Sequence, residues 1–177
     1  MSITPLWEAT RDIHHACEAH PVGHAMAQGN PPKKWYAAWL TALHQIHSAI
    51  DDSMAYLLQR EYLLANDITD SGFNLEDSKA ANLYIQTLKT ENDIAGACYV
   101  LTGAHLMGGE IMRRKLIGYP TSHLTWQDRQ AALQELHKLR SRTDIVDSSR
   151  ACFAALLSVM DEIMAKYPEE VADEVAV

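Results

Sequence analysis

Residues 99–116 read YVLTGAHLMGGEIMRRKL. The spacing of the apolar residues predicts a helix, yet the stretch holds Gly103, Gly108 and Gly109. Each glycine inside a helix costs about 1 kcal/mol relative to alanine. A missing side chain lets another group approach the backbone closely, and it also lets a helix bend. The approaching group is either a tightly packed neighbouring helix or a flat ligand, and the spacing alone leaves both open.

The length and charge of the chain limit what it can be. Its 177 residues, 47% of them hydrophobic, suffice for one domain with a proper core. A net charge of −8 argues against nucleic-acid binding, because such binding depends largely on neutralising phosphates. No apolar run reaches the roughly 18 residues of a membrane span, and the first residues lack a secretory signal. Three cysteines without CxxC spacing fit a reducing compartment, so we expect a cytoplasmic protein.

Helical periodicity runs through nearly the whole chain, and no stretch has the alternation that is typical of strands. We therefore predict an all-α fold of about seven or eight helices in one domain, residues 1–167, followed by an acidic flexible tail, residues 168–177. Thr4 and Pro5 form a cap and a first turn, and the polar residues 66–74 read as a loop. The helices are expected at about 5–20, 22–28, 33–50, 56–65, 76–88, 91–116, 125–140 and 144–166.

Nine histidines stand out in a chain with only two phenylalanines. His14 lies near the apolar side of the first helix, His105 lies among the glycines, and His44 and His47 are one turn apart on the third helix. A histidine on a half-apolar face is more often a core residue than a ligand. The pair of His44 and His47 is a weak metal-site signal because no third ligand is indicated, and the absence of paired ExxH motifs disfavours a di-iron bundle. The remaining histidines read as surface or loop residues: His15, His20, His24, His123 and His137.

The first helix resembles that of the haem oxygenases. LWEATRDIHHACE, residues 6–18, follows the pattern L-[KR]-E-x-T-x-x-x-H-x-x-x-E except that Trp7 replaces the basic residue. In that family the histidine of the pattern, here His14, is the proximal ligand of the haem iron. Residues 43–52 resemble the family's third helix, and residues 149–163 its closing helix.

The glycine-bearing stretch then resembles the family's distal helix, whose glycines let haem lie against the backbone. On this interpretation Gly103, Gly108 and Gly109 form the ceiling of a haem pocket. His105 takes the position of an aspartate that organises distal water in the animal enzymes, and His47 takes that of a tyrosine, so these two are the candidate catalytic residues. A distal histidine can hydrogen-bond bound dioxygen and supply protons, or it can ligate the iron instead.

The resemblance implies further contacts to haem. Tyr99 matches a tyrosine near a haem propionate, and Met26 falls where it can pack on the ring. Because Trp7 replaces the basic residue that binds a propionate in the family, a residue of the seventh helix would have to substitute for it. The candidates are Arg140, Arg129 and Lys138.

A haem oxygenase would use haem as substrate and prosthetic group and convert it, with oxygen and external electrons, to biliverdin, iron and carbon monoxide. The chain has no flavin or nucleotide motif, so electrons would come from a partner such as ferredoxin or a flavin reductase. Two alternatives keep the fold: a catalytically impaired haem- or bilin-binding sensor, carrier or partner-binding module, and a non-haem iron enzyme. The basic residues that could dock an acidic donor are Lys33, Lys34, Arg113, Arg114 and Lys115.

Overall fold

The computed structural model describes residues 4–168, and every regular element in this range is helical, which confirms the all-α prediction. The α-helices are α1 (Pro5–Ala19), α2 (Pro21–Gln28), α3 (Lys33–Ile50), α4 (Glu61–Ser71), α5 (Lys79–Ile85), α6 (Glu91–Gly103), α7 (Gly109–Lys115), α8 (Arg129–Arg140) and α9 (Val146–Lys166). Shorter turns are η1 (Asp51–Ser53), η2 (Tyr56–Leu58), η3 (Ala104–Gly108) and η4 (Ser122–Leu124). No helix in this range is long and apolar enough to cross a membrane. Residues 169–177 of the expected tail lie outside the described residues.

The helix ends follow local sequence signals. Thr4 accepts a hydrogen bond from the first turn of α1, and Pro5 stands at the start of that turn, as predicted. A capping box opens α6, in which the side chains of Thr90 and Asp93 each bind the other's backbone N–H. Gly29 ends α2 with a φ of 85°, a left-handed conformation that glycine adopts without steric cost.

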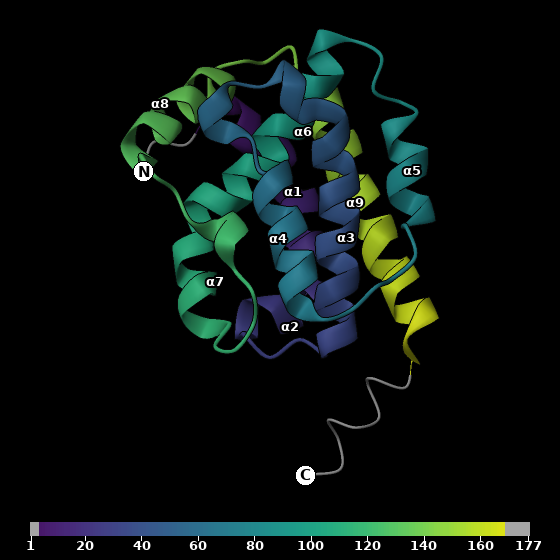
Figure 1. Cartoon of the computed structure of the whole chain (residues 1–177). Coiled ribbons are helices and arrows are strands. Elements are labelled where there is room, and N and C mark those ends of the chain that lie inside the picture. The colour runs from purple at the N-terminus through teal and green to yellow at the C-terminus, as the bar shows by residue number, and fades with distance from the viewer. Residues whose placement is uncertain (1–3, 169–177) are drawn as a thin grey trace.

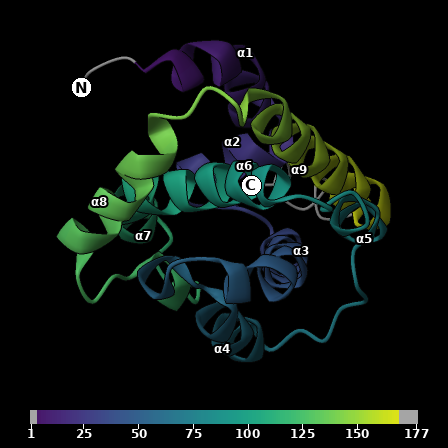
Figure 2. The same cartoon turned by 90° about the horizontal axis from the view of Figure 1, so that it is seen from above.

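Two groups of helices lie on either side of α6. The longest helix, α9, packs against α1, α5 and α6, whereas α3 packs against α4 and α5. Figure 2 shows α6 crossing the middle of the molecule, with α1 and α9 on one side and α3 and α4 on the other. The side chains of α6 can therefore face two different environments, one next to α1 and one next to α3.

The glycine-bearing stretch is one continuous helical rod with a π-helical turn inside it. Because α6, η3 and α7 follow each other without a gap, the nine labelled α-helices of the described chain form eight rods. The wider π turn disturbs the regular ladder, and Arg129 of α8 donates from Nη2 to the carbonyl of Leu106 at 2.9 Å. Such turns bend helices and occur frequently at functional sites. Figure 1 shows α7 running downward from the end of α6.

The loop predicted for residues 66–74 is wrong in its first part. Helix α4 extends to Ser71, and Gly72 ends it with a φ of 75°. The polar residues that suggested a loop include Asp67, which is only 1% exposed and accepts hydrogen bonds from the backbone of Ser122 and His123. These partners lie 55 and 56 residues further along the chain, so local composition contained no sign of them.

Candidate functional site

The imidazole of His14 lies on α1 between two aromatic rings. The Trp7 ring is 4.9 Å away and the Phe153 ring of α9 is 5.7 Å away, both edge-on. The Nδ1 atom of His14 is buried without a hydrogen-bond partner, and the Glu18 carboxylate is 3.6 Å from it. Burial lowers the pKa of His14, although the Glu18 charge opposes this shift. The ring is therefore neutral at pH 7 and keeps a lone pair for a metal ion.

The helical rod presents a face with almost no side chains between residues 103 and 108. A Cβ added at Gly103 or Gly108 would meet no atom within 4 Å, and Ala104 is exposed. At Gly96 the same addition would lie 2.6 Å from the Cβ of Ser148, so this glycine lets α6 pack closely on α9. On this rod, Gly96 thus allows close packing of a neighbouring helix, whereas Gly103 and Gly108 leave open space beside the backbone.

Tyr99 marks the point where α6 meets α1. Burial raises the pKa of its phenol, and an interaction with the Thr10 hydroxyl and the positive charge of Arg140 only partly oppose this shift. Thr10 is fully buried, and Arg140 is the last residue of α8. One helical turn is 3.6 residues, so His14 follows Thr10 by about one turn. Gly103 follows Tyr99 in the same way, so His14 and Gly103 each lie about one helical turn from the contact of Thr10 with Tyr99.

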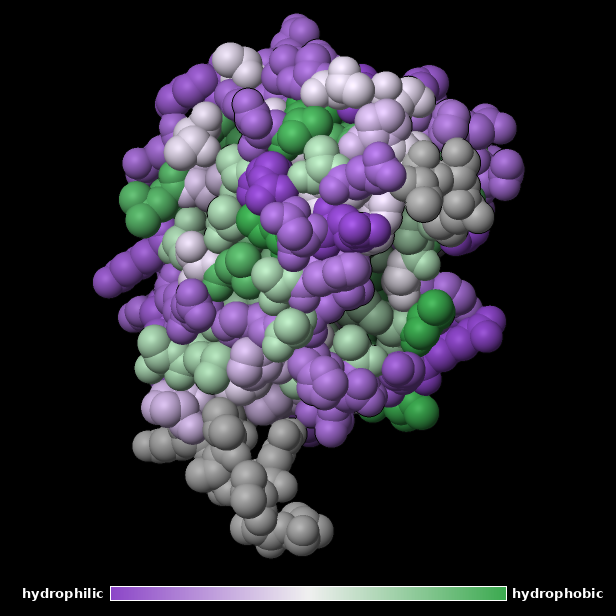
Figure 3. Space-filling model, turned by 180° about the vertical axis from the view of Figure 1, so that it is seen from behind, coloured by the Kyte–Doolittle hydropathy of each residue, from purple (hydrophilic) through white to green (hydrophobic). Residues whose placement is uncertain are grey.

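The back of the molecule, the face opposite to that of Figure 1, is hollowed. In Figure 3 weakly hydrophobic residues, in pale green, lie inside a recess to the right of centre, and hydrophilic residues border it. We call the part of α1, the rod and α8 that carries His14, Tyr99, Arg140 and residues 103–108 the α1–α6 crevice. A cavity of about 420 Å³ lies elsewhere, between α6, α8 and the η1–η2 segment, and none of these crevice residues lines it.

A cluster of buried histidines lies on the side of the rod that faces α3. The His105 ring stacks on that of His47, with centroids 5.9 Å apart, and lies edge-on to His123 at 5.2 Å. Two aspartates hold the outer rings: Asp51 Oδ1 is 2.7 Å from Nδ1 of His47, and Asp67 Oδ2 is 2.5 Å from Nδ1 of His123. We call these five residues the histidine–aspartate cluster.

The cluster keeps its central and η4 histidines neutral and its aspartates ionised. Burial lowers the pKa of His105 far below its usual value, and the neighbouring histidines add to this effect. Burial also lowers the pKa of His123, against the opposing hydrogen bond to Asp67. Burial would raise the pKa of Asp51 and Asp67, but hydrogen bonds to their histidine and backbone partners lower it. The ionised Asp67 therefore accepts a hydrogen bond from the neutral His123 ring.

Arg60 balances the negative charge of the aspartates. Its backbone N–H donates to Asp51 Oδ2 at 2.7 Å, and its guanidinium donates to the carbonyls of Thr125 and Leu57. The same guanidinium lies 3.5 Å from the centre of the Trp126 ring, a cation–π contact. Burial lowers the pKa of Arg60 to about 10, so it stays charged at pH 7. Sequence analysis gave neither Arg60 nor Trp126 a role.

No protein-family model matches the sequence, and no curated protein sequence matches it. Solved structures do match. Haem oxygenase-1 from the cyanobacterium Synechocystis, in complex with haem, has a TM-score of 0.81 with 17% identity, over 96% of this chain and 95% of that chain. The chain has the fold of the haem oxygenases.

Two further matches support the same fold. Haem oxygenase from Leptospira interrogans has a TM-score of 0.77 with 19% identity, over 89% of this chain and 97% of that chain. Haem oxygenase-2 from Synechocystis, in complex with haem and NO, has a TM-score of 0.75 with 20% identity, over 91% of this chain and 86% of that chain. The resemblance seen in the first and distal helices is thus confirmed as a likeness of fold.

On this haem oxygenase fold the expected site residues fall into two groups. Tyr99 interacts with Thr10 of α1 and Arg140 of α8, and Gly103 and Gly108 leave open space on the same rod. By contrast, the two candidate catalytic histidines belong to the histidine–aspartate cluster, where their rings contact other histidines rather than α1.

Some expected contacts of the haem oxygenase site have other partners. Gly109 is buried, and a Cβ there would lie 3.4 Å from Leu124, so it faces η4. Met26 is 5% exposed and belongs to the apolar core. His44 lies 3.9 Å from Glu61, on α4, whereas His47 is buried against Asp51. These two histidines therefore do not share a metal site.

Sequence analysis was wrong about His123, which is buried rather than on the surface. Its partner Asp67 lies 56 residues earlier in the chain, so no local signal marks this histidine as buried. Of the alternative propionate partners, Arg129 binds the carbonyl of Leu106, and Lys138 pairs with Glu135.

Proposed function

We propose that this chain is a haem oxygenase, which cleaves haem to biliverdin, iron and carbon monoxide with dioxygen and external electrons. The observation that carries the proposal is the α1–α6 crevice. A neutral imidazole, His14, and a helix face left open at Gly103 and Gly108 lie close to one junction there. When bound, haem supplies both the iron that activates dioxygen and the ring carbon that is oxidised.

The residues of the crevice fit a haem group. A ring nitrogen of His14 would hold the haem iron, and the bare backbone at Gly103 and Gly108 would accommodate a flat ring that a side chain would exclude. Arg140 and the Tyr99 hydroxyl, which lie together at the junction, bind propionate carboxylates, since a guanidinium recognises carboxylates well. Met26, which belongs to the apolar core, would pack on the ring from that side. Gly109 has no side chain, so the rod lies close to η4 there.

The histidine–aspartate cluster supplies protons from behind the rod. The Nδ1 atom of His105 and the Nε2 atom of His47 are buried without hydrogen-bond partners, so each can bind a water molecule. The two aspartates accept hydrogen bonds from the outer rings and thereby fix their tautomers. His105 and His47 are therefore the residues that organise water and move protons on the distal side.

An external protein such as ferredoxin or a flavin reductase delivers the electrons. The basic surface available for it is smaller than the sequence suggests, because Arg113 and Arg114 both pair with Glu110. Lys115 donates to the carbonyl of Ala27.

Haemin titration followed by reduction tests the proposal. The purified protein is titrated with haemin, then ascorbate or reduced ferredoxin is added in air with catalase present. We expect the Soret band to disappear while biliverdin absorption grows. His14→Ala should lose the axial ligand and change the ferric spectrum, whereas His137→Ala, at an exposed position of α8, is the matched control. An unchanged spectrum in His14→Ala would contradict the assignment of the axial ligand.

A second candidate function is a haem- or bilin-binding protein without catalysis. It is favoured by Leu101 and Leu156, which are buried and apolar where the resemblance expects an arginine and an asparagine of the water network. This function predicts a Soret band that persists under ascorbate and air. The same titration therefore separates the two functions, and failure to take up haemin would contradict both.

A further inference from the structure

Three metal-ligating side chains converge on α1 at the edge of the crevice. One ring nitrogen of His14, one ring nitrogen of His15 and one carboxylate oxygen of Glu18 all lie within 4.8 Å of one another. Within residues 4–168 no other group of three histidine, cysteine or carboxylate side chains meets this distance. His15 and Glu18 are exposed, so a hydrated ion can reach them.

The helix itself brings these donors together. His14 and Glu18 are one turn apart, and their Nδ1 and Oε2 atoms are separated by 3.6 Å. The rings of His14 and His15 have centroids 5.9 Å apart. Metal–ligand bonds to imidazole and carboxylate are about 2.0–2.2 Å long. Small rotations of the two exposed side chains therefore suffice for one ion to bind all three donors.

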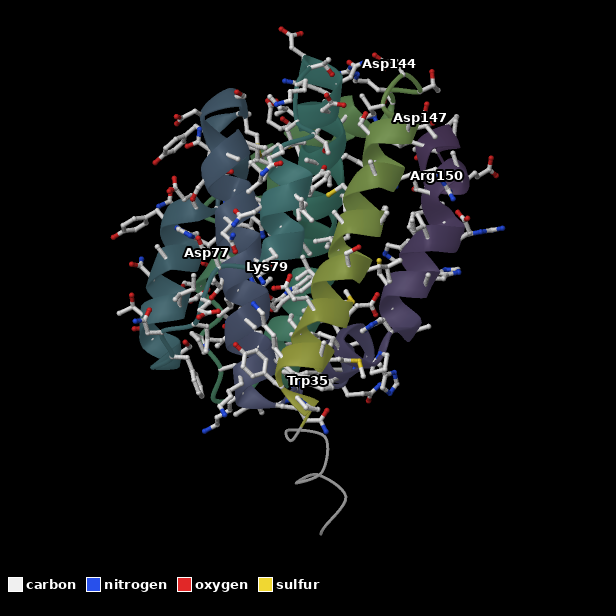
Figure 4. All side chains as sticks on the ribbon, turned by 90° about the vertical axis from the view of Figure 1, so that its right-hand side faces the viewer. Trp35, Asp77, Lys79, Asp144, Asp147 and Arg150 are labelled. Carbon is white, nitrogen blue, oxygen red and sulfur yellow. The ribbon has the colours of Figure 1, made fainter. Side chains whose placement is uncertain are left out.

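Neighbouring charges leave Glu18 available for a cation. Asp12 is also a carboxylate of α1, but Arg150 of α9 holds it through two hydrogen bonds of 2.6 and 2.9 Å. Figure 4 shows Arg150 on the side of α9 that is next to α1. Among the described residues the only ion pair of Glu18 is with His14.

We propose that α1 carries a binding site for a divalent transition-metal ion, formed by His14, His15 and Glu18. Two imidazoles and one carboxylate are a donor set that suits Fe²⁺ and Zn²⁺ and leaves further positions for water. The site differs from the proposed haem site in its two further donors, His15 and Glu18. It shares His14 with that site, so haem and a free divalent ion compete for one imidazole.

If the chain is a haem oxygenase, the sharing of His14 gives the metal site a role in retaining iron. Cleavage of haem frees Fe²⁺ beside His14, and the two neighbouring donors complete a triad that retains it. This transfer is a ligand exchange, in which donor atoms replace one another on the ion and no electron moves. This use rests on the proposed function, whereas the metal site itself does not.

Co²⁺ titration of the haem-free protein tests the site. The Trp7 ring lies 4.9 Å from that of His14 and 6.3 Å from that of His15, so bound Co²⁺ should quench Trp7 fluorescence. We expect one equivalent to bind by calorimetry, with visible d–d absorption. His15→Ala and Glu18→Gln should each weaken binding about tenfold or more, since loss of even an outer partner of a metal ligand costs that much. Trp7→Phe should abolish quenching but keep the calorimetric signal.

Two controls make the result decisive. His137→Ala, on α8, should bind Co²⁺ like the original chain, and His15→Ala should retain its haemin Soret band. Far-ultraviolet circular dichroism of each variant checks the fold. If His15→Ala and Glu18→Gln, properly folded, bind Co²⁺ as tightly as the original chain, the metal site is wrong.

The outcomes for haem and for Co²⁺ are independent. Co²⁺ binding that depends on His15 and Glu18, without haemin uptake, supports the metal site and contradicts the proposed function. Haemin turnover without such Co²⁺ binding supports the proposed function and contradicts the metal site. Competition is read by calorimetry, in which Co²⁺ should bind the haemin-loaded protein more weakly than the haem-free protein.

Discussion

His105 and His123 are buried so deeply that the folded chain keeps both neutral at pH 7. In the unfolded chain a histidine has its ordinary pKa of 6.5. As the pH falls below 6.5, the unfolded chain therefore binds protons that the folded chain does not, and the free energy of unfolding falls. The pKa of Asp51 and Asp67 is lowered from 3.8, so the stability they contribute is present above pH 3.8 and is lost only at lower pH. The interval between pH 6.5 and about pH 5 therefore reports mainly on the histidines, since Glu162 and Glu110 have a pKa lowered from 4.5 and act at lower pH.

Replacing His105 should flatten this pH dependence. In His105→Gln the free energy of unfolding, measured by urea denaturation from pH 7 to pH 5, should fall less steeply than in the original chain. The difference can reach at most about 1.4 kcal/mol per pH unit, the full contribution of one histidine. His137→Gln is the exposed control and should keep the original slope. An equal slope in His105→Gln would show that this ring is not kept neutral by its burial.

The helical rod of α6, η3 and α7 allows a prediction at the scale of one element. Gly103→Ala should raise the free energy of unfolding by up to about 1 kcal/mol, because alanine favours helix and the added methyl group meets open space. The same variant should bind haemin more weakly, since that methyl group projects into the crevice. Thermal unfolding and haemin titration measure the two effects.

Gly96→Ala is the matched comparison on the same rod. Its Cβ would lie 2.6 Å from Ser148 Cβ and 2.7 Å from backbone atoms of α9, which cannot move freely. We expect a loss of about 1–3 kcal/mol, typical of overpacking, with no direct effect on haemin affinity. Equal effects of the two substitutions on stability would contradict the distinction between a packing glycine and an open one.

Elements with local signals could be predicted from the sequence, and those fixed by distant partners could not. The cap at Thr4 and Pro5 and the rod of residues 91–115 follow from neighbouring residues alone. The end of α4 does not, because Asp67 is buried by partners more than 50 residues away. For the same reason the histidine–aspartate cluster could not be predicted. Its rings come from α3, η3 and η4, and sequence order does not give the distances between them.

At the scale of the whole molecule, haemin should change amide hydrogen exchange differently on the two sides of α6. In Figure 2, α1 and α4 lie on opposite sides of α6, and α5 packs on α9 and α3. Haemin should therefore slow amide hydrogen exchange in α1 and in residues 99–109. Exchange in α4 and α5 should change much less. Mass spectrometry of peptides from both regions measures this, and uniform slowing across the chain would indicate general stabilisation instead of binding in the crevice.

The attachment of α1 determines how a wide, rigid molecule reaches the centre of the protein. This helix packs mainly on α9 and α2, and Arg150 ties its outer surface to α9. Its meeting with α6 includes the pair of Thr10 and Tyr99. Moving α1 outward from α6 therefore leaves the packing among α3, α4, α5 and α9 intact. On the proposed function, the rate at which a macrocycle enters should therefore depend on how firmly α1 is held on α9 and α2 rather than on the stability of the fold.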